Sequence, residues 1–112
     1  MVGVIEMNKS IEKVLLINII GTLEAIGNNA ISISEGEKFL FSPQKTRKLI
    51  NMGCDDRIVS IIEEGCELED IESIIPHKLP ENILKLKKRA LDILMKYEKI
   101  DNIDWNEIIG SI

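Results

Sequence analysis

The fold is decided by residues 34–73, SEGEKFLFSPQKTRKLINMGCDDRIVSIIEEGCELEDIES. Glycine, proline and helix-capping residues recur at short intervals in this stretch, and the apolar residues between them are spaced three and four apart. Serine or aspartate before such a pattern and glycine after it are typical helix boundaries. The stretch therefore predicts three or four short helices in succession.

These short helices have recognisable start signals. Ser34 and Glu37 have the S-x-x-E spacing of a capping box, which would open a helix that runs through Phe41. Proline suits the first position of a helix, because its ring fixes φ and its missing N–H would have no intrahelical partner there. Further helices are expected at residues 43–52, 56–64 and 67–75, the second with Asp55 as N-cap, and they end at Gly53, Gly65 and Pro76.

A longer helix is expected on each side of this stretch. Ser10 is a candidate N-cap for a helix that ends before Gly27. Apolar residues cover most of the circumference of this first helix, which is typical of the centre of a bundle or of a subunit interface. Pro80 opens the last long helix, residues 80–98. Its expected inward positions are Ile83, Leu84, Leu86, Ala90, Leu91, Ile93, Leu94 and Tyr97.

Together these patterns predict an all-α fold, a small helical bundle of five to six helices in which two longer helices enclose three or four short ones. A chain of 112 residues has the size of one domain. Residues 1–7 lack a periodic pattern, so we expect a disordered leader there and a single helical domain at residues 8–112. Asp104 and Glu107 predict one more capped turn, which carries Trp105.

Cysteine content and hydropathy favour a cytoplasmic location. The apolar residues suffice for a core without a disulfide, so Cys54 and Cys66 are expected to be reduced thiols. Residues 8–27 imitate a signal peptide, but Glu12 flanks the apolar run, Asn18 interrupts it, and no small-residue cleavage site follows. A membrane-spanning helix is not expected, because it would need about 20 mostly apolar residues.

Charge changes sign along the chain, whose net charge is −5. Residues 38–48 carry four basic groups and no acid, residues 55–72 carry eight acids against Arg57 alone, and residues 78–99 carry seven basic groups against three acids. Many of the central acids fall in first helical turns, where the macrodipole favours negative charge. We hypothesise that the remaining acidity forms a docking surface for a basic protein partner. Its residues are Glu63, Glu64, Glu67, Glu69, Asp70 and Glu72.

The same acids do not predict a metal site or a cofactor. The acidic run lacks the alternating ligands and central glycine of a calcium loop. A carboxylate-bridged di-metal site would need Glu-x-x-His pairs, and the single histidine, His77, lies outside that pattern. No glycine-rich phosphate loop occurs, because the glycines lie at helix ends.

The cysteines and the basic residues could suggest catalysis or DNA binding. Cys54 and Cys66 each adjoin a helix N-terminus, which lowers a thiol pKa, but one histidine is thin support for a cysteine enzyme. Residues 46–64 have the length of a helix-turn-helix, yet its second helix ends in acids that would repel phosphate. Basic faces at residues 45–48 and on the last helix keep a nucleic-acid-associated regulator as the alternative function.

Residues 37–43, EKFLFSP, and residues 65–73, GCELEDIES, resemble a small bacterial family that is a domain of unknown function. In that family threonine is usual where this chain has Cys66, and threonine there would form a capping box with Glu69. The resemblance implies that Cys66→Thr raises the midpoint of thermal unfolding. It implies no catalytic or ligand residues.

The sequence thus favours a non-enzymatic cytoplasmic protein of unknown specific role, a protein–protein interaction module with an acidic surface. An immunity protein or antitoxin that neutralises a basic toxin or nuclease would fit the size and the sign of the charge by analogy. The strongly apolar first helix also suits a homodimer.

Overall fold

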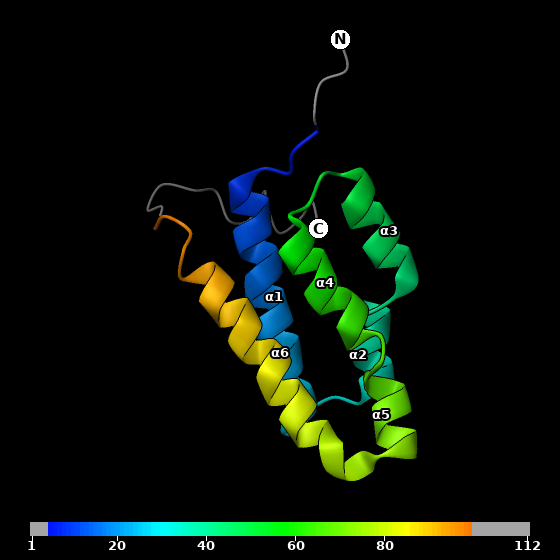
Figure 1. The fold of residues 1–112 in the computed structure, drawn as a ribbon. Coiled ribbons are helices and arrows are strands. Elements are labelled where there is room, and N and C mark those ends of the chain that lie inside the picture. The colour runs from blue at the N-terminus through cyan, green and yellow to red at the C-terminus, as the bar shows by residue number, and fades with distance from the viewer. Residues whose placement is uncertain (1–4, 100–112) are drawn as a thin grey trace.

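A computed structural model describes residues 5–99, and this part of the chain is helical without strands. The elements are α1 (Lys9–Gly27), α2 (Ile33–Phe39), α3 (Pro43–Asn51), α4 (Asp56–Gly65), α5 (Leu68–Ile74), a single 3₁₀ turn η1 (Pro76–Lys78) and α6 (Leu79–Leu94) (Figure 1). The predicted all-α class is confirmed, as are its two long helices. Four of these helices have nine residues or more, so the expected five to six are reached only when seven-residue α2 and α5 are counted.

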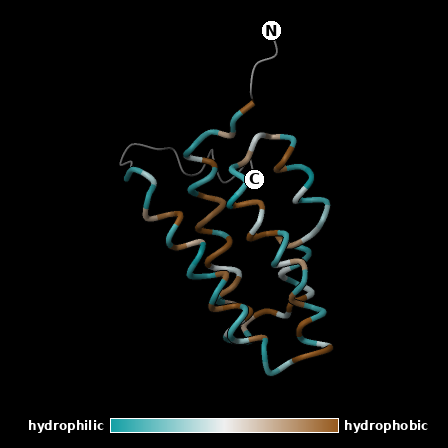
Figure 2. Tube along the Cα trace, in the orientation of Figure 1, coloured by the Kyte–Doolittle hydropathy of each residue, from teal (hydrophilic) through white to brown (hydrophobic). Residues whose placement is uncertain are grey.

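The long helices α1 and α6 lie side by side and run in opposite directions (Figure 1). The expectation that they enclose the short helices is therefore wrong. Apolar residues on several faces of α1 allow it to pack against α6 on one side and against α4 and α2 on the other. Hydrophobic residues follow α1 through the middle of the bundle in Figure 2.

The core is built mainly by α1 and α4. Leu16, Ile19 and Leu23 of α1 are 0% exposed. The predicted inward arc of α4 is confirmed, since its four aliphatic residues are at most 5% exposed. Burying one such side chain stabilises a fold by about 1.5–3 kcal/mol, so these contacts outweigh any single surface ion pair. The arc consists of Ile58, Val59, Ile61 and Ile62.

The N-terminus of α1 differs from the prediction. Asn8, not Ser10, is the N-cap, and its Oδ1 accepts a hydrogen bond of 2.7 Å from the Ser10 N–H. Asparagine caps a helix as well as serine does, so the N-cap lies two residues earlier than predicted. Met7 is also buried, and its N–H donates to the Gly53 carbonyl at 3.0 Å. Met7 therefore belongs to the folded domain and not to the expected leader.

The start of α2 also differs from the prediction. The capping box is formed by Ser32 and Glu35, two residues before the expected pair. Both pairs have the S-x-x-E spacing, and packing selects between them. The earlier start buries Ile33 and places Gly36 against Ile26, where a Cβ would lie 2.6 Å from the Ile26 Cδ1.

The predicted starts of α3 and α4 are confirmed, and α5 begins at Leu68, one residue after the predicted Glu67. Ser42 caps α3 ahead of Pro43, and Asp55 caps α4. Cys66 closes α4 in a helical conformation, and its thiol donates to the Ile62 carbonyl at 3.3 Å. Glu67 precedes α5 without a side-chain cap, so the capping box expected of threonine at position 66 has no basis in this backbone.

The last helix ends at Leu94, four residues before the predicted end. Leu84 and Leu91, which were expected to face inward, are 61% and 40% exposed. Their positions follow from the face that α6 presents to α1, because Ile83, Leu86, Ala90 and Ile93 already occupy it. The predicted capped turn around Trp105 lies outside the described residues. Within residues 5–99, no helix combines the length and the apolar content needed to cross a bilayer.

Candidate functional site

The predicted acidic residues lie at the end of α4 and on α5, and they do not form one uniform surface. All six are exposed, but Glu64 pairs with Arg89 of α6 and is thereby neutralised. The other five make no ion pair with any residue in the described range 5–99. Because Leu68 anchors α5 to the core, the acids on either side of it face outward. These five are Glu63, Glu67, Glu69, Asp70 and Glu72.

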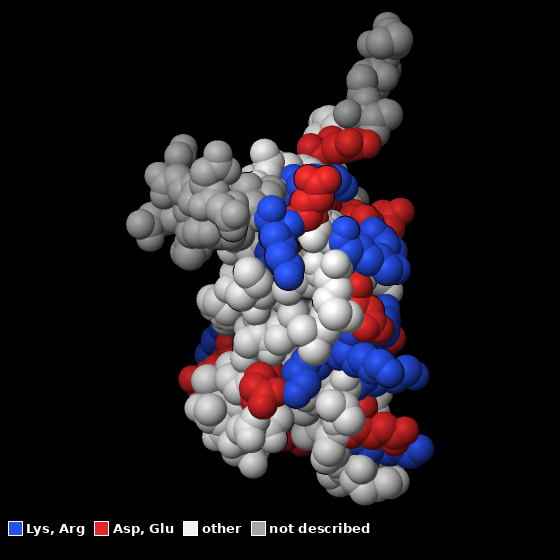
Figure 3. All heavy atoms as spheres, turned by 90° about the vertical axis from the view of Figure 1, so that its left-hand side faces the viewer, with Lys and Arg blue, Asp and Glu red and all other residues white. Residues whose placement is uncertain are grey.

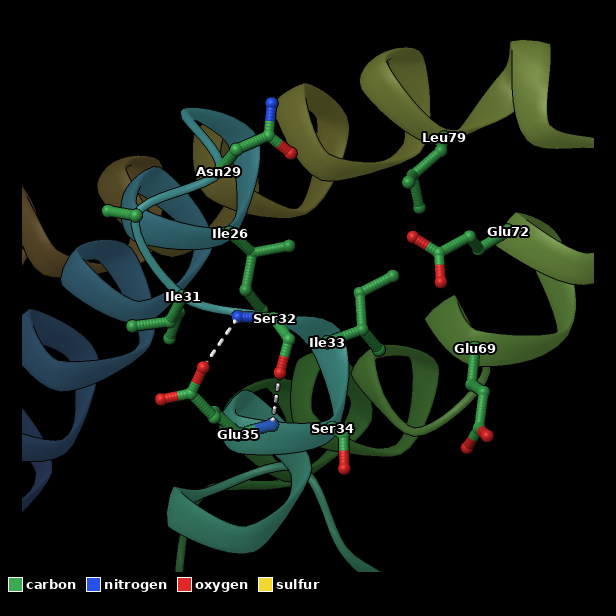
Figure 4. A pocket seen from close by; sticks show the side chains of 11 residues that line it. Ile26, Asn29, Ile31, Ser32, Ile33, Ser34, Glu35, Glu69, Glu72 and Leu79 are labelled. Atoms are coloured by element: carbon green, nitrogen blue, oxygen red, sulfur yellow. Dashed lines mark hydrogen bonds between the residues drawn. The ribbon is translucent and has the colours of Figure 1, made fainter.

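Two of these acids line a cleft between α5, the start of α2 and the start of α6 (Figure 4). The cleft has a volume of about 440 Å³. Ile26, Ile33 and Leu79 supply its apolar side chains. In Figure 4 the Glu72 carboxylate lies close to Ile33 and Leu79, whereas the Glu69 carboxylate points away from them. The cleft thus combines aliphatic side chains with polar ones, and Glu72 is the carboxylate that lies against the aliphatic part.

The opposite wall of this cleft is fixed by the capping box of α2. Ser32 Oγ accepts from the Glu35 N–H at 3.0 Å, and Glu35 Oε1 accepts from the Ser32 N–H at 3.1 Å (Figure 4). These reciprocal bonds engage the Glu35 carboxylate and hold the wall in place. The hydroxyl of Ser34 projects beside them and is exposed.

Like charges are concentrated beside the cleft, where α2 approaches α5. Partial burial, and then the nearby Glu69 carboxyl, raise the pKa of Glu37 above its ordinary value. Asp70 acts in the same direction. A carboxyl flanked by carboxyls weakens folding at neutral pH, because one of the charges must be held against repulsion. The sequence suggested a different role for Glu37, in a capping box that the structure forms elsewhere.

This arrangement can hold a cation with an aliphatic stem. Lysine and arginine bury their methylene groups on apolar surface while the charged end stays near an anion. The isoleucines and Leu79 would contact the stem, and Glu72 would pair with the charged group. Within residues 5–99, no group of three or more His, Cys, Asp or Glu is placed to hold a metal ion.

The basic residues are divided between different parts of the molecule. Lys87 and Arg89 of α6 are engaged by Glu24 and Glu64. Figure 3 shows Lys and Arg interspersed with Asp and Glu on the face that it presents, not gathered by sign. On α6 itself, Lys85 and Lys88 form no ion pair with the described residues. The lysines of residues 38–48 lie on α2 and α3 instead.

One important residue was not recognised as such in the sequence. Glu12 is 2% exposed, and its Oε2 accepts from the Asp55 N–H at 2.7 Å. Its Oε1 accepts from the Tyr97 hydroxyl at 2.9 Å. Glu12 thereby joins α1, the N-cap of α4 and the turn that follows α6. Its spacing of four residues from the buried Leu16 was a signal for an inward position.

The two cysteines are free thiols, of which Cys54 is buried and Cys66 half-buried. Burial raises the pKa of Cys54 to about 12, and the nearby Glu12 and Asp55 act in the same direction. Burial also raises the pKa of Cys66. The adjacent helix N-terminus was expected to lower these values, but burial outweighs it.

Fold and site define a small helical protein with a cleft that combines aliphatic and carboxylate side chains. The chain belongs to the family described as "Protein of unknown function (DUF3969)", which matches residues 6–107. The resemblance to an uncharacterised family is therefore confirmed. No curated protein and no solved structure matches the chain.

Proposed function

We propose that the protein is a non-enzymatic, cytoplasmic protein–protein interaction module that binds a basic partner through the cleft between α2, α5 and α6. The observation that carries this proposal is the placement of a carboxylate that forms no ion pair with the described residues, Glu72, against the aliphatic side chains of the cleft. A lysine or arginine of the partner would enter the cleft. Free thiols at both cysteines suit the reducing compartment assumed here.

The surrounding acids support the same proposal. Glu63, Glu67, Glu69 and Asp70 extend negative charge from the cleft along α5 and the end of α4. Such a field would steer a basic partner toward the cleft and would weaken with salt. The unfavourable crowding of Glu37 and Glu69 is also consistent with a surface kept acidic for binding at some cost in stability. A neutraliser of a basic toxin or nuclease would use a surface of this kind.

Site-specific crosslinking tests the proposal. A photo-crosslinking residue at Ser34, on the wall of the cleft, should capture a basic protein in an extract of the source cells. Capture should weaken in Glu72→Gln and in high salt. Glu81→Gln is the matched control, because Glu81 is an exposed acid in the first turn of α6 that does not line the cleft.

A binding assay with a defined probe complements the capture. An arginine- and leucine-containing peptide of about 12 residues should bind the wild type and lose about tenfold in affinity in Glu72→Gln. Equal losses in Glu72→Gln and Glu81→Gln would show that only net charge matters and would refute a specific cleft. Capture of nucleic acid in place of protein would favour the alternative of a nucleic-acid-associated regulator.

A further inference from the structure

A second hollow, bordered by lysines where the first cleft has glutamates, lies between α1, the end of α2 and α3. Its volume is about 350 Å³. Leu15, Leu40 and Leu49 line it and are at most 8% exposed, so they belong to the core as well. Phe39 at its edge is 57% exposed. Met7, held by its hydrogen bond to Gly53, also lines it.

The hollow continues along α1. An adjoining hollow of about 530 Å³ shares Asn18 and Phe39 with it and extends past Gly21 to Ala25. The distance from Ile11 to Ala25 along the axis of α1 is roughly 21 Å, or about four helical turns. The residues of α1 that line the two hollows include a set spaced 4-3-4-3, the spacing of a coiled-coil seam. This set, which we call the α1 seam, is Ile11, Leu15, Asn18, Thr22 and Ala25.

Gly21 leaves open space beside the seam. A glycine inside a helix costs about 0.5–1 kcal/mol relative to alanine. The fold of this chain does not require it, because a Cβ at Gly21 would meet no atom within 4 Å. The neighbouring Ile17 is 50% exposed. The open space and the exposed isoleucine lie beside the α1 seam and leave its flank uncovered.

Positive charge lines one end of the α1 seam. Lys38, Lys45 and Lys48 border the first hollow, and none of them forms an ion pair with the described residues. No acid occurs in residues 38–48, although the whole chain has a net charge of −5. The first hollow therefore combines a mostly apolar floor with a cationic rim.

We propose that the α1 seam binds an amphipathic, acidic α-helix of a partner protein. Apolar residues of that helix would fill the two hollows at three- and four-residue spacing, and its carboxylates would pair with the three lysines. A second copy of this chain fits less well, because it would bring the same lysines to the interface. The second hollow of that copy contains one acid that could pair with the lysines, Glu35. This carboxylate is already engaged in the capping box of α2.

The test uses a labelled, helix-forming peptide of about 18 residues with leucines at heptad a and d positions and glutamates beside them. A matched peptide with glutamine in place of glutamate isolates the contribution of charge. Fluorescence anisotropy should show the acidic peptide binding about tenfold more tightly than its glutamine counterpart at low salt, with the difference lost at high salt. Equal affinities, or no binding of either peptide, would overturn the proposal.

Variants locate the binding. Lys45→Glu/Lys48→Glu should remove the preference for the acidic peptide, whereas Lys85→Glu/Lys88→Glu on α6 should leave it unchanged. Gly21→Leu should weaken binding of both peptides by about tenfold or more, because its side chain would occupy the open flank of the seam. Lys45 is half-buried and the other positions are exposed, and circular dichroism spectra should confirm that each variant folds.

Two further outcomes separate this proposal from its competitors. Light scattering that shows a dimer of the wild type and a monomer of Gly21→Leu would assign the seam to a second copy and refute the partner helix. Glu72→Gln should not change binding of the acidic peptide, since Glu72 lies in the other cleft. The two binding proposals can therefore fail independently.

Discussion

Removal of the buried carboxyl group of Glu12 should destabilise the protein severely. Glu12 accepts hydrogen bonds from the Asp55 N–H and from the Tyr97 hydroxyl, at 2.7 and 2.9 Å. In Glu12→Ala both donors lose their partner, at a site where Glu12 itself is 2% exposed and Asp55 and Tyr97 are half-buried. Leaving one buried donor unsatisfied costs about 1–3 kcal/mol. Lys9, which is 69% exposed, adds little through its contact at 3.4 Å.

The expected loss for Glu12→Ala is therefore about 3–5 kcal/mol, a large share of the roughly 5–15 kcal/mol that stabilises a typical domain. Urea unfolding followed by circular dichroism would measure it. The melting temperature should fall by about 15 °C or more. Tyr97→Phe, which removes one donor and keeps the ring, should lose only about 1–2 kcal/mol.

A matched exposed acid provides the control for this prediction. Glu63→Ala removes a carboxylate that makes no ion pair with the described residues, so the free energy of unfolding should change by less than about 0.5 kcal/mol. The double variant Glu12→Ala/Tyr97→Phe should lose less than the sum of the single variants, because they share one hydrogen bond. A loss below about 1 kcal/mol in Glu12→Ala would refute the idea that Glu12 joins the three segments.

Gly65→Ala should cost about 1–3 kcal/mol, because the added Cβ would lie 2.4 Å from a ring carbon of the buried Phe41, and an unchanged urea midpoint would contradict this packing. At neutral pH the thiol of Cys54 should react far more slowly with a disulfide reagent than a free thiol does, since burial and nearby acids raise its pKa to about 12; fast labelling of the folded protein would show otherwise. The raised pKa of Glu37 means that its charged form opposes folding above that pKa and that this penalty disappears as the pH falls. Glu37→Gln should therefore stabilise the protein at pH 7 and lose this advantage near pH 4, whereas a gain of equal size at both values would exclude titration of Glu37 as the cause. Cys66→Thr should leave the melting temperature nearly unchanged, because a threonine hydroxyl can also donate to the Ile62 carbonyl; a clear rise would restore the capping-box interpretation.

Local signals in the sequence predicted helix starts reliably where only one capping residue was available. Pro43 after a serine and Asp55 before an apolar arc each marked a helix start that the structure contains. Where two signals competed, local chemistry did not choose between them. Ser32–Glu35 and Ser34–Glu37 have the same spacing, and the contact of Gly36 with Ile26 selected the first.

The candidate sites depended more strongly on packing. All six predicted acids are exposed, but the pairing of Glu64 with Arg89 joins residues 25 apart in the chain and could not be foreseen from their neighbours. The cleft at Glu72 exists only because α5 is placed beside the start of α2. The spacing of the α1 seam can be read from the sequence. The hollow beside its first half depends on where α3 lies.

The sequence by itself determined that this chain forms short helices with capped starts and aliphatic inner faces, because hydrogen bonds and side-chain spacing within one turn are local properties. Tertiary structure alone decided that Glu12 would be buried against Tyr97, 85 residues away, and that α1 would present an open flank. Such pairings follow from how helices of given shape pack together, and that geometry belongs to the whole molecule.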